Sequence, residues 1–202
     1  MIFKFSFISI SLAFFGLIAT IGCNSDATKV AKAEEASPNY AGNYADPNVI
    51  LSENQEAVGV LYDYYTQNPT TQKQIDENKI IDYIMKMELP YERTESGLYY
   101  YITKEGKGPN YVNGQPAKAN YRGYFLNGSI FDSSYSRNRP ISFKTGMMVA
   151  GWNEAMSFMN PGTHAMLLLP SHLAYGEGGF ANIVGPHEVL GFDVELLNLT
   201  VK

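Results

Sequence analysis

The chain has 202 residues, of which 45% are apolar and 17% are charged, so it can bury one ordinary hydrophobic core. Its formal net charge is −5, and it has no concentrated run of lysine and arginine. These features argue against nucleic-acid binding, because contacts to phosphates require a basic surface. We therefore expect partners that are proteins or small molecules, and no nucleic acid.

Residues 1–22 have the pattern of a secretory signal peptide. After Lys4 an uncharged, largely apolar stretch leads to Cys23, the only cysteine in the chain. This arrangement is typical of bacterial lipoproteins, although Thr20 stands where leucine is usual. The alternative is an uncleaved membrane helix, since roughly 18 apolar residues are just enough to span a bilayer. Both alternatives predict a location in the bacterial cell envelope, with a membrane anchor and the rest of the chain facing the periplasm or the cell exterior. In the lipoprotein interpretation, Cys23 is the site of lipid attachment.

The next segment, residues 23–46, is small and polar, and it has too few large apolar side chains to offset the entropy of ordering. It is predicted to be a flexible tether. Helical spacing of apolar residues then predicts two helices, over residues 47–67 and 71–89, that form a helical hairpin over residues 47–91.

Local signals delimit the two helices. Asp46 is a favourable N-cap and Pro69 is expected to stop the first helix. Thr71 and Gln74 have the spacing of a capping box, and Pro90 follows the second helix. We favour a hairpin that packs on the main domain. A dimerisation or client-holding arm is the alternative, which would give a homodimer through the hairpin.

The last predicted domain, residues 92–202, has the periodicity of strands. Aromatic, β-branched and alternating segments predict four main strands, within residues 97–104, 115–128, 163–170 and 189–201. A change of parity at Leu197 suggests a bulge, or an element covered on both faces. One short helix is expected between the strands, starting at Asn153 and stopped by Pro161. This pattern predicts a sheet packed on one short helix.

The sequence lacks several familiar catalytic signatures. No glycine-rich dinucleotide loop and no G-x-S-x-G motif is present. His164, His172 and His187 lack the spacing of metal ligands, and Cys23 has no partner for a disulfide. We therefore expect chemistry that needs no cofactor, no metal and no covalent nucleophile.

Three runs carry a family resemblance: YRGYFLNGSIFDSSY, then GMMVAGWNEAMSFMNPGTHAMLLLPSHLAYGEGG, then PHEVLGFDVELLNL. In this order and spacing they resemble the FKBP-type (macrolide-binding) peptidyl-prolyl cis-trans isomerases, over residues 94–202. The resemblance implies an α+β fold, in which a curled antiparallel β-sheet packs on one short α-helix. It also implies a shallow hydrophobic pocket under a glycine-rich loop.

The same resemblance assigns roles to residues of the pocket. Trp152 is implied to form its floor. The Val149 backbone N–H and the Tyr175 hydroxyl are implied to bind substrate carbonyls, while Asp132 orients polar groups at the rim. The other substrate-binding side chains implied are aromatic or aliphatic: Tyr121, Phe131, Ile141, Phe143, Met148, Val184 and Phe192.

The implied activity is peptidyl-prolyl cis-trans isomerisation (rotamase activity) that assists the folding of exported proteins. Rotation about an X-Pro amide has a barrier of about 18–20 kcal/mol, because resonance holds the bond planar. A dry pocket weakens the charge-separated resonance form that water stabilises, and so favours the twisted transition state. The implied partners are proline-containing polypeptide clients and macrolide-type inhibitors.

Each assignment has a simpler alternative. Trp152 and Phe192 could be core residues, and Asp132 could be a turn cap. Gly185 stands where the family usually has proline, and Gly191 where a larger apolar residue is common, so either could reshape the pocket. Two other functions therefore remain open. One is a chaperone or binding module that has the FKBP fold but weak catalysis, and the other is a structural lipoprotein of envelope or gliding machinery.

Overall fold

The computed structural model describes residues 59–197. The predicted signal peptide, Cys23, the tether over residues 23–46 and most of the first predicted helix lie outside the described residues. The predicted division into domains stays a prediction. The fold below is that of the unit that contains the described residues.

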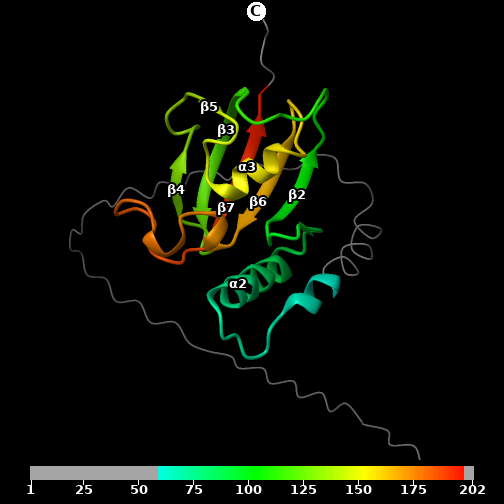
Figure 1. Cartoon of the computed structure of the whole chain (residues 1–202), viewed down its shortest axis with the longest axis vertical. Coiled ribbons are helices and arrows are strands. Elements are labelled where there is room, and N and C mark those ends of the chain that lie inside the picture. Colours follow the sequence, from blue (N-terminus) through cyan, green and yellow to red (C-terminus); the bar gives the residue numbers. More distant parts are fainter. Residues whose placement is uncertain (1–58, 198–202) are drawn as a thin grey trace, which may run out of the picture. The chain divides into compact units, whose positions relative to one another are not determined.

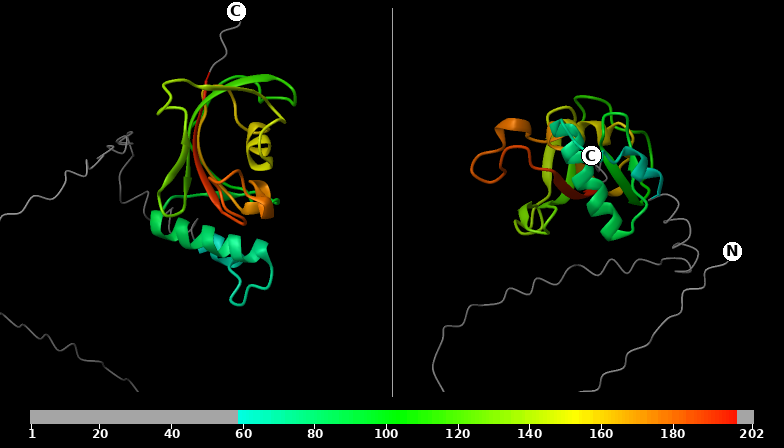
Figure 2. Two further views of the ribbon diagram at one scale, coloured as in Figure 1. Left: turned by 90° about the vertical axis from the view of Figure 1, so that its left-hand side faces the viewer. Right: turned by 90° about the horizontal axis from the view of Figure 1, so that it is seen from below.

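The fold is a seven-stranded antiparallel sheet with one helix on each of its two faces. The strands follow the order β1-β2-β6-β7-β3-β4, and β5 pairs with β3 beside this path. Figure 1 shows α3 lying across the sheet, and Figure 2 shows the strands curling around that helix. The predicted fold class is confirmed. The strands are β1 (Glu92–Arg93), β2 (Tyr99–Lys104), β3 (Pro116–Phe125), β4 (Ile130–Ser133), β5 (Ile141–Lys144), β6 (His164–Leu169) and β7 (Leu190–Leu196). The helical elements are η1 (Tyr62–Tyr64), α2 (Gln72–Met87), α3 (Ala150–Met156), η2 (Ser171–Leu173) and η3 (Gly176–Gly178).

Helix α2 packs on the face of the sheet opposite to α3. In β6, Leu167 and Leu169 belong to the core cluster that contains α3, whereas Leu168 belongs to a second cluster that contains α2. Successive side chains of a strand point to opposite faces, so the two helices cover opposite faces. This double coverage explains why β6 is a continuous apolar run. The expectation that the second helix of the hairpin packs on the main domain agrees with these contacts.

The start of α2 follows the predicted capping box. The Thr71 side chain accepts a hydrogen bond from the Gln74 N–H at 3.3 Å, and the Gln74 side chain accepts one from the Thr71 N–H at 3.2 Å. The first helix, in contrast, was predicted to reach residue 67, but its helical residues end at Tyr64. Here Asn78 of α2 binds both backbone groups of Thr66, at 2.9 and 2.8 Å, in place of helical hydrogen bonds.

Two further boundaries differ from those predicted. Helix α3 begins at Ala150 rather than Asn153, because the Asn153 side chain binds the turn that precedes the helix. A Cβ on Gly151 would lie 2.5 Å from the Leu169 side chain, so glycine allows α3 to approach β6 closely. Strand β7 ends at Leu196 without a register shift against either neighbour. The Leu197 N–H still donates to the Lys118 carbonyl of β3 at 2.9 Å, and the residues after Leu197 lie outside the described residues, so the bulge stays a prediction.

Candidate functional site

Aromatic rings from several elements converge on Trp152 of α3, which is 1% exposed. Its indole contacts Tyr121 at 5.5 Å between ring centroids, Phe143 at 5.8 Å and Phe192 at 5.6 Å. All three contacts are edge-to-face, the arrangement that ring quadrupoles favour. Phe131 adds a further edge-to-face contact with Phe192 at 5.7 Å. We call these five residues the ring cluster.

The register of the sheet brings the ring cluster together. Gly123 of β3 lies opposite Phe192 of β7. A Cβ on Gly123 would lie 2.6 Å from the ring of Phe131 and 3.0 Å from the ring of Phe192. Glycine at this position therefore leaves the space that two rings of the cluster occupy.

Apart from Asp132, the remaining predicted site residues on the described part of the chain lie in or against the core cluster that contains Trp152. Val184 is buried in it. Four others are partly buried and pack against it: Ile141, Met148, Val149 and Tyr175. The structure thus brings together the apolar residues that the resemblance implied, while the role of each residue stays a prediction. Cys23 lies outside the described residues.

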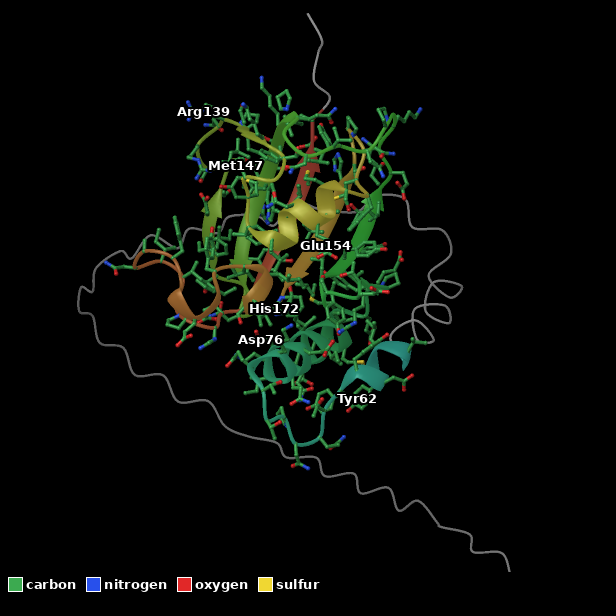
Figure 3. The ribbon with its side chains drawn as sticks, viewed as in Figure 1. Tyr62, Asp76, Arg139, Met147, Glu154 and His172 are labelled. Carbon is green, nitrogen blue, oxygen red and sulfur yellow. The ribbon has the colours of Figure 1, made fainter. Side chains whose placement is uncertain are left out.

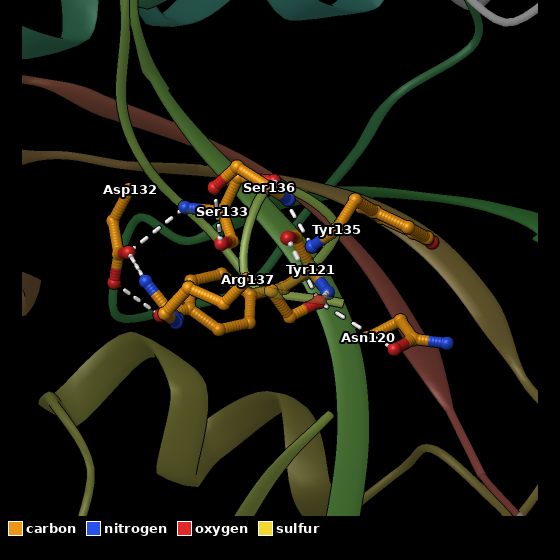
Figure 4. Close-up of polar contacts among 8 residues, drawn as sticks. Asn120, Tyr121, Asp132, Ser133, Tyr135, Ser136 and Arg137 are labelled. Atoms are coloured by element: carbon orange, nitrogen blue, oxygen red, sulfur yellow. Dashed lines mark hydrogen bonds and ion pairs between the residues drawn. The ribbon is translucent and has the colours of Figure 1, made fainter. Parts of the chain in front are cut away.

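A polar network at the edge of the ring cluster holds Asp132 in place (Figure 4). Its carboxylate accepts hydrogen bonds from the Tyr121 hydroxyl and from Arg137 Nη1, and one from the Ser133 N–H at 2.8 Å. Arg137 Nη2 also donates to the Tyr121 hydroxyl at 3.0 Å. Asp132 is therefore more than a turn cap, since its carboxylate joins a member of the ring cluster to a cation. Arg137, five residues further along the same turn, was not predicted as a site residue.

The network sets the ionisation of Asp132. Partial burial acts to raise the pKa of its carboxyl group, but the hydrogen bonds from Tyr121 and Arg137 and the charge of Arg137 outweigh burial. The net pKa lies below the ordinary aspartate value. Asp132 is therefore a carboxylate at neutral pH.

Asn153 positions the backbone before α3, and its role was also missed from the sequence. Its Oδ1 accepts hydrogen bonds from the N–H groups of Gly146 and Met148, at 3.0 and 3.1 Å. Its Nδ2 donates to the Met148 carbonyl at 2.6 Å. The Val149 N–H follows directly, and it makes no hydrogen bond within residues 59–197. This N–H is thus available to a ligand carbonyl.

Tyr175 lies on the glycine-rich loop and stacks on Phe180, with ring centroids 4.8 Å apart. Burial raises the pKa of its hydroxyl, and the negative charge of Asp132 raises it further, so the group remains a donor at neutral pH. In the described part of the chain this hydroxyl has no hydrogen-bond partner. Gly179 has φ +64°, and a Cβ there would lie 2.4 Å from the Val184 carbonyl oxygen. The loop therefore needs glycine to turn, while Phe180 keeps half of its surface exposed.

Gly191 and Gly185, the two glycines that depart from the family pattern, lie in different surroundings. Gly191 pairs with Tyr124, and a Cβ at this position would lie 2.2 Å from the Tyr124 ring. It adjoins Phe192 in β7, so it faces the opposite side of the sheet from the ring cluster. The expectation that Gly191 reshapes the pocket is therefore wrong, because the Tyr124 ring occupies the space of the missing side chain. At Gly185 a Cβ would meet only Glu188, at 3.6 Å.

Residues 59–197 contain no group of three or more His, Cys, Asp or Glu side chains that could hold a metal ion. Over the same range, no helix is both long enough and apolar enough to cross a membrane.

Comparison with known proteins identifies the family. Residues 108–197 match the sequence model of the FKBP-type peptidyl-prolyl cis-trans isomerases. The chain is 37% identical over 107 residues to the peptidyl-prolyl cis-trans isomerase Mip of Coxiella burnetii, a match that covers 53% of this chain and 46% of that protein. It is 34% identical over 142 residues to FkpA of Buchnera aphidicola, covering 68% of this chain and 56% of that protein. The chain thus spans about half the length of the curated relatives that it matches.

Solved structures agree with this assignment. The crystal structure of AtFKBP13 matches with a TM-score of 0.51 and 34% identity, over 54% of this chain and 97% of that chain. The crystal structure of FkpA from Escherichia coli matches with a TM-score of 0.55 and 27% identity, over 73% of this chain and 62% of that chain. The match to AtFKBP13 covers nearly that whole protein at 34% identity. The chain therefore belongs to the FKBP-type peptidyl-prolyl cis-trans isomerase family.

Proposed function

We propose that this protein is a peptidyl-prolyl cis-trans isomerase that acts on proline-containing polypeptides. The observation that carries the proposal is the ring cluster around Trp152, with two donors that pack against the same core and have no acceptor among residues 59–197, the Val149 N–H and the Tyr175 hydroxyl. Trp152, Tyr121 and Phe192 are buried, whereas Phe131 and Phe143 are only partly buried and give the cluster an accessible edge. An apolar edge next to amide-binding donors suits a proline ring and its flanking carbonyl groups. Family membership supports the same activity.

The proposed mechanism is desolvation of the X-Pro amide without a covalent intermediate. The proline ring lies against the ring cluster, which removes water from the amide and weakens its charge-separated resonance form. The barrier to rotation, about 18–20 kcal/mol in water, then falls. Val149 and Tyr175 donate to substrate carbonyls and hold the twisted geometry. Asp132, fixed by Tyr121 and Arg137, orients the polar rim.

A kinetic experiment tests this activity. The purified protein is added to short peptides with an apolar residue before proline, and separately to a protein whose refolding is limited by proline isomerisation. We expect acceleration of both reactions without added metal or nucleotide. Binding of the peptides without any acceleration would contradict the proposal and favour a chaperone or binding module. Competition by a macrolide would show that inhibitor and peptide share one site.

We also propose that the protein is attached to the bacterial envelope through a lipid on Cys23 and assists the folding of exported clients there. The support is the apolar leader before the only cysteine. Labelling of cells with a fatty acid should mark the wild-type protein but not Cys23→Ala. Unlabelled wild-type protein with an intact N-terminus would contradict the anchor and favour an uncleaved membrane helix.

Homodimerisation through the helical hairpin is a further proposal, to be tested by the sedimentation of the purified protein at several concentrations.

A purely structural role in envelope machinery is tested by the phenotype of cells that carry variants of the candidate site residues. Loss of the tether alone, residues 24–46, would impair a structural lipoprotein most. Helix α2 should be kept in this experiment, because it shares a core cluster with the sheet.

A further inference from the structure

We propose that Asp76 of α2 is a positioning residue for Tyr175 and acts on it through Ser171. The inference rests on the proposed isomerase function, and it extends the functional unit to a helix on the opposite face of the sheet from the ring cluster. Figure 3 shows Asp76 on α2 beside η2, the short helical turn that leads to the glycine-rich loop.

Asp76 is completely buried and fully engaged in hydrogen bonds. Its side chain is 0% exposed. Oδ2 accepts from the Ser171 N–H at 2.9 Å and from the Ser171 hydroxyl at 2.5 Å, while Oδ1 accepts from Gln72 Nε2 at 2.7 Å. A buried carboxylate is tolerated only when such donors surround it, and hydrogen bonds to a charged acceptor are the stronger kind. Asp76 therefore binds both hydrogen-bond donors of Ser171 from a helix 95 residues away in sequence.

A short hydrogen-bonded turn connects Ser171 to Tyr175. It begins η2, in which the Leu173 N–H donates to the Pro170 carbonyl at 2.9 Å and the Ala174 N–H donates to the Ser171 carbonyl at 3.0 Å. Leu173 is buried in the core cluster that contains Trp152. Tyr175 follows Ala174 directly and is the N-cap of η3. A shift of Ser171 is therefore expected to move the backbone of Tyr175, which begins the next turn.

The arrangement predicts an effect on rate beyond any effect on stability. Asparagine at position 76 keeps the shape of aspartate, but it has a single acceptor atom and presents an amide to one of the donors. With its oxygen toward Ser171, the asparagine keeps both bonds to Ser171, but on an uncharged acceptor that holds Ser171 more weakly than a carboxylate does. A misplacement of 1 Å at a catalytic group can cost roughly 10²-fold in rate, so a smaller shift is expected to cost about tenfold in kcat/KM.

The experiment compares Asp76→Asn with the matched control Glu77→Gln in the full chain. Glu77 is the neighbouring carboxylate on α2, but it accepts from Arg93 at 2.6 Å and from the Tyr99 hydroxyl at 3.1 Å, so it holds α2 to β1 and β2 and not to the loop. We expect Asp76→Asn to lower kcat/KM about tenfold and Glu77→Gln to change it less than about twofold. Equal losses in the two variants at equal melting temperatures would overturn the proposal.

Two further measurements separate positioning from general destabilisation. In the Tyr175→Phe background, Asp76→Asn should lower kcat/KM by a clearly smaller factor than in the wild type, whereas independent effects that simply multiply would overturn the proposal. If Asp76→Asn does not fold, Ser171→Ala removes one donor and leaves the backbone N–H, and the same comparison applies.

A readout without turnover keeps this proposal distinct from the proposed function. Backbone amide NMR resonances of residues 171–180 should shift in Asp76→Asn but not in Glu77→Gln. Unshifted loop resonances in Asp76→Asn would overturn the positioning role, whether or not the wild-type protein is active. An inactive wild-type protein whose loop still shifts in Asp76→Asn would overturn the proposed function and leave the structural link between Asp76 and the loop supported.

Discussion

Replacing Phe192 by alanine should destabilise the fold more than it changes the chemistry of the site. Phe192 is 3% exposed, and its ring contacts Trp152 and Phe131 edge-on. The neighbouring rings come from α3 and β4, whose backbones the sheet holds in place, so they cannot close the cavity fully. Removal of a buried phenylalanine side chain of this kind costs about 3–5 kcal/mol. That is a large share of the 5–15 kcal/mol typical of a domain.

Urea denaturation followed by tryptophan fluorescence measures this loss, because Trp152 is the only tryptophan and contacts Phe192 directly. The midpoint should fall while the slope stays constant, which would indicate a change in stability rather than in the extent of unfolding. Phe180→Ala is the matched control, since Phe180 is half exposed and stacks only at the surface of the loop. A loss below about 1 kcal/mol in Phe192→Ala would show that Phe192 is not a core residue, since core truncations of this size cost several times more.

Four further predictions rest on the same geometry. Tyr175→Phe removes one donor worth about 0.5–1.5 kcal/mol net, so kcat/KM should fall by a factor of roughly two to twelve while the melting temperature stays nearly constant. Asp132→Val should lower activity and leave part of the macrolide binding intact. It should change stability little, because the Asp132 side chain is 38% exposed. A melting temperature as low as that of Phe192→Ala would instead make Asp132 a structural cap. Because the pKa of Asp132 is lowered in the folded protein, its carboxylate stabilises the fold fully above the ordinary aspartate pKa of about 3.9. This stabilisation disappears as the pH falls through the lower folded-state pKa. The stability of Asp132→Asn, measured against pH, should lack this loss. Gly191→Ala places a Cβ against the Tyr124 ring and should cost about 1–3 kcal/mol, yet kcat/KM per folded molecule should not change, because Gly191 faces away from the site.

Local signals in the sequence predicted the elements that local forces determine. The capping box of Thr71 and Gln74 marked the start of α2 to within one residue, because both of its hydrogen bonds lie inside one helical turn. The end of the preceding helix was missed, because Asn78 of another helix replaces the hydrogen bonds that residue 66 would make in a longer helix. Tertiary contacts of this kind leave no periodic pattern.

The apolar part of the candidate site was accessible from the sequence only through the family resemblance. No spacing rule relates Phe192 to Gly123, and their relation appears only in the register of β3 and β7. The supporting polar residues were missed for a similar reason. Asn153 looks in the sequence like any polar residue of a short helix. Asp76 contacts Ser171 across 95 residues. Neither contact leaves a pattern in the neighbouring sequence.

NMR of the protein with a peptide that contains an apolar residue before proline tests both the proposed isomerase activity and the place where it occurs. We expect exchange between the cis and trans resonances of the peptide that is much faster than in free solution. We also expect magnetisation transfer from the proline ring to the Trp152 indole and its neighbours in the ring cluster. Unaccelerated exchange in a folded protein would contradict the isomerase activity, and contacts from the proline ring only to residues outside the cluster would contradict the proposed site.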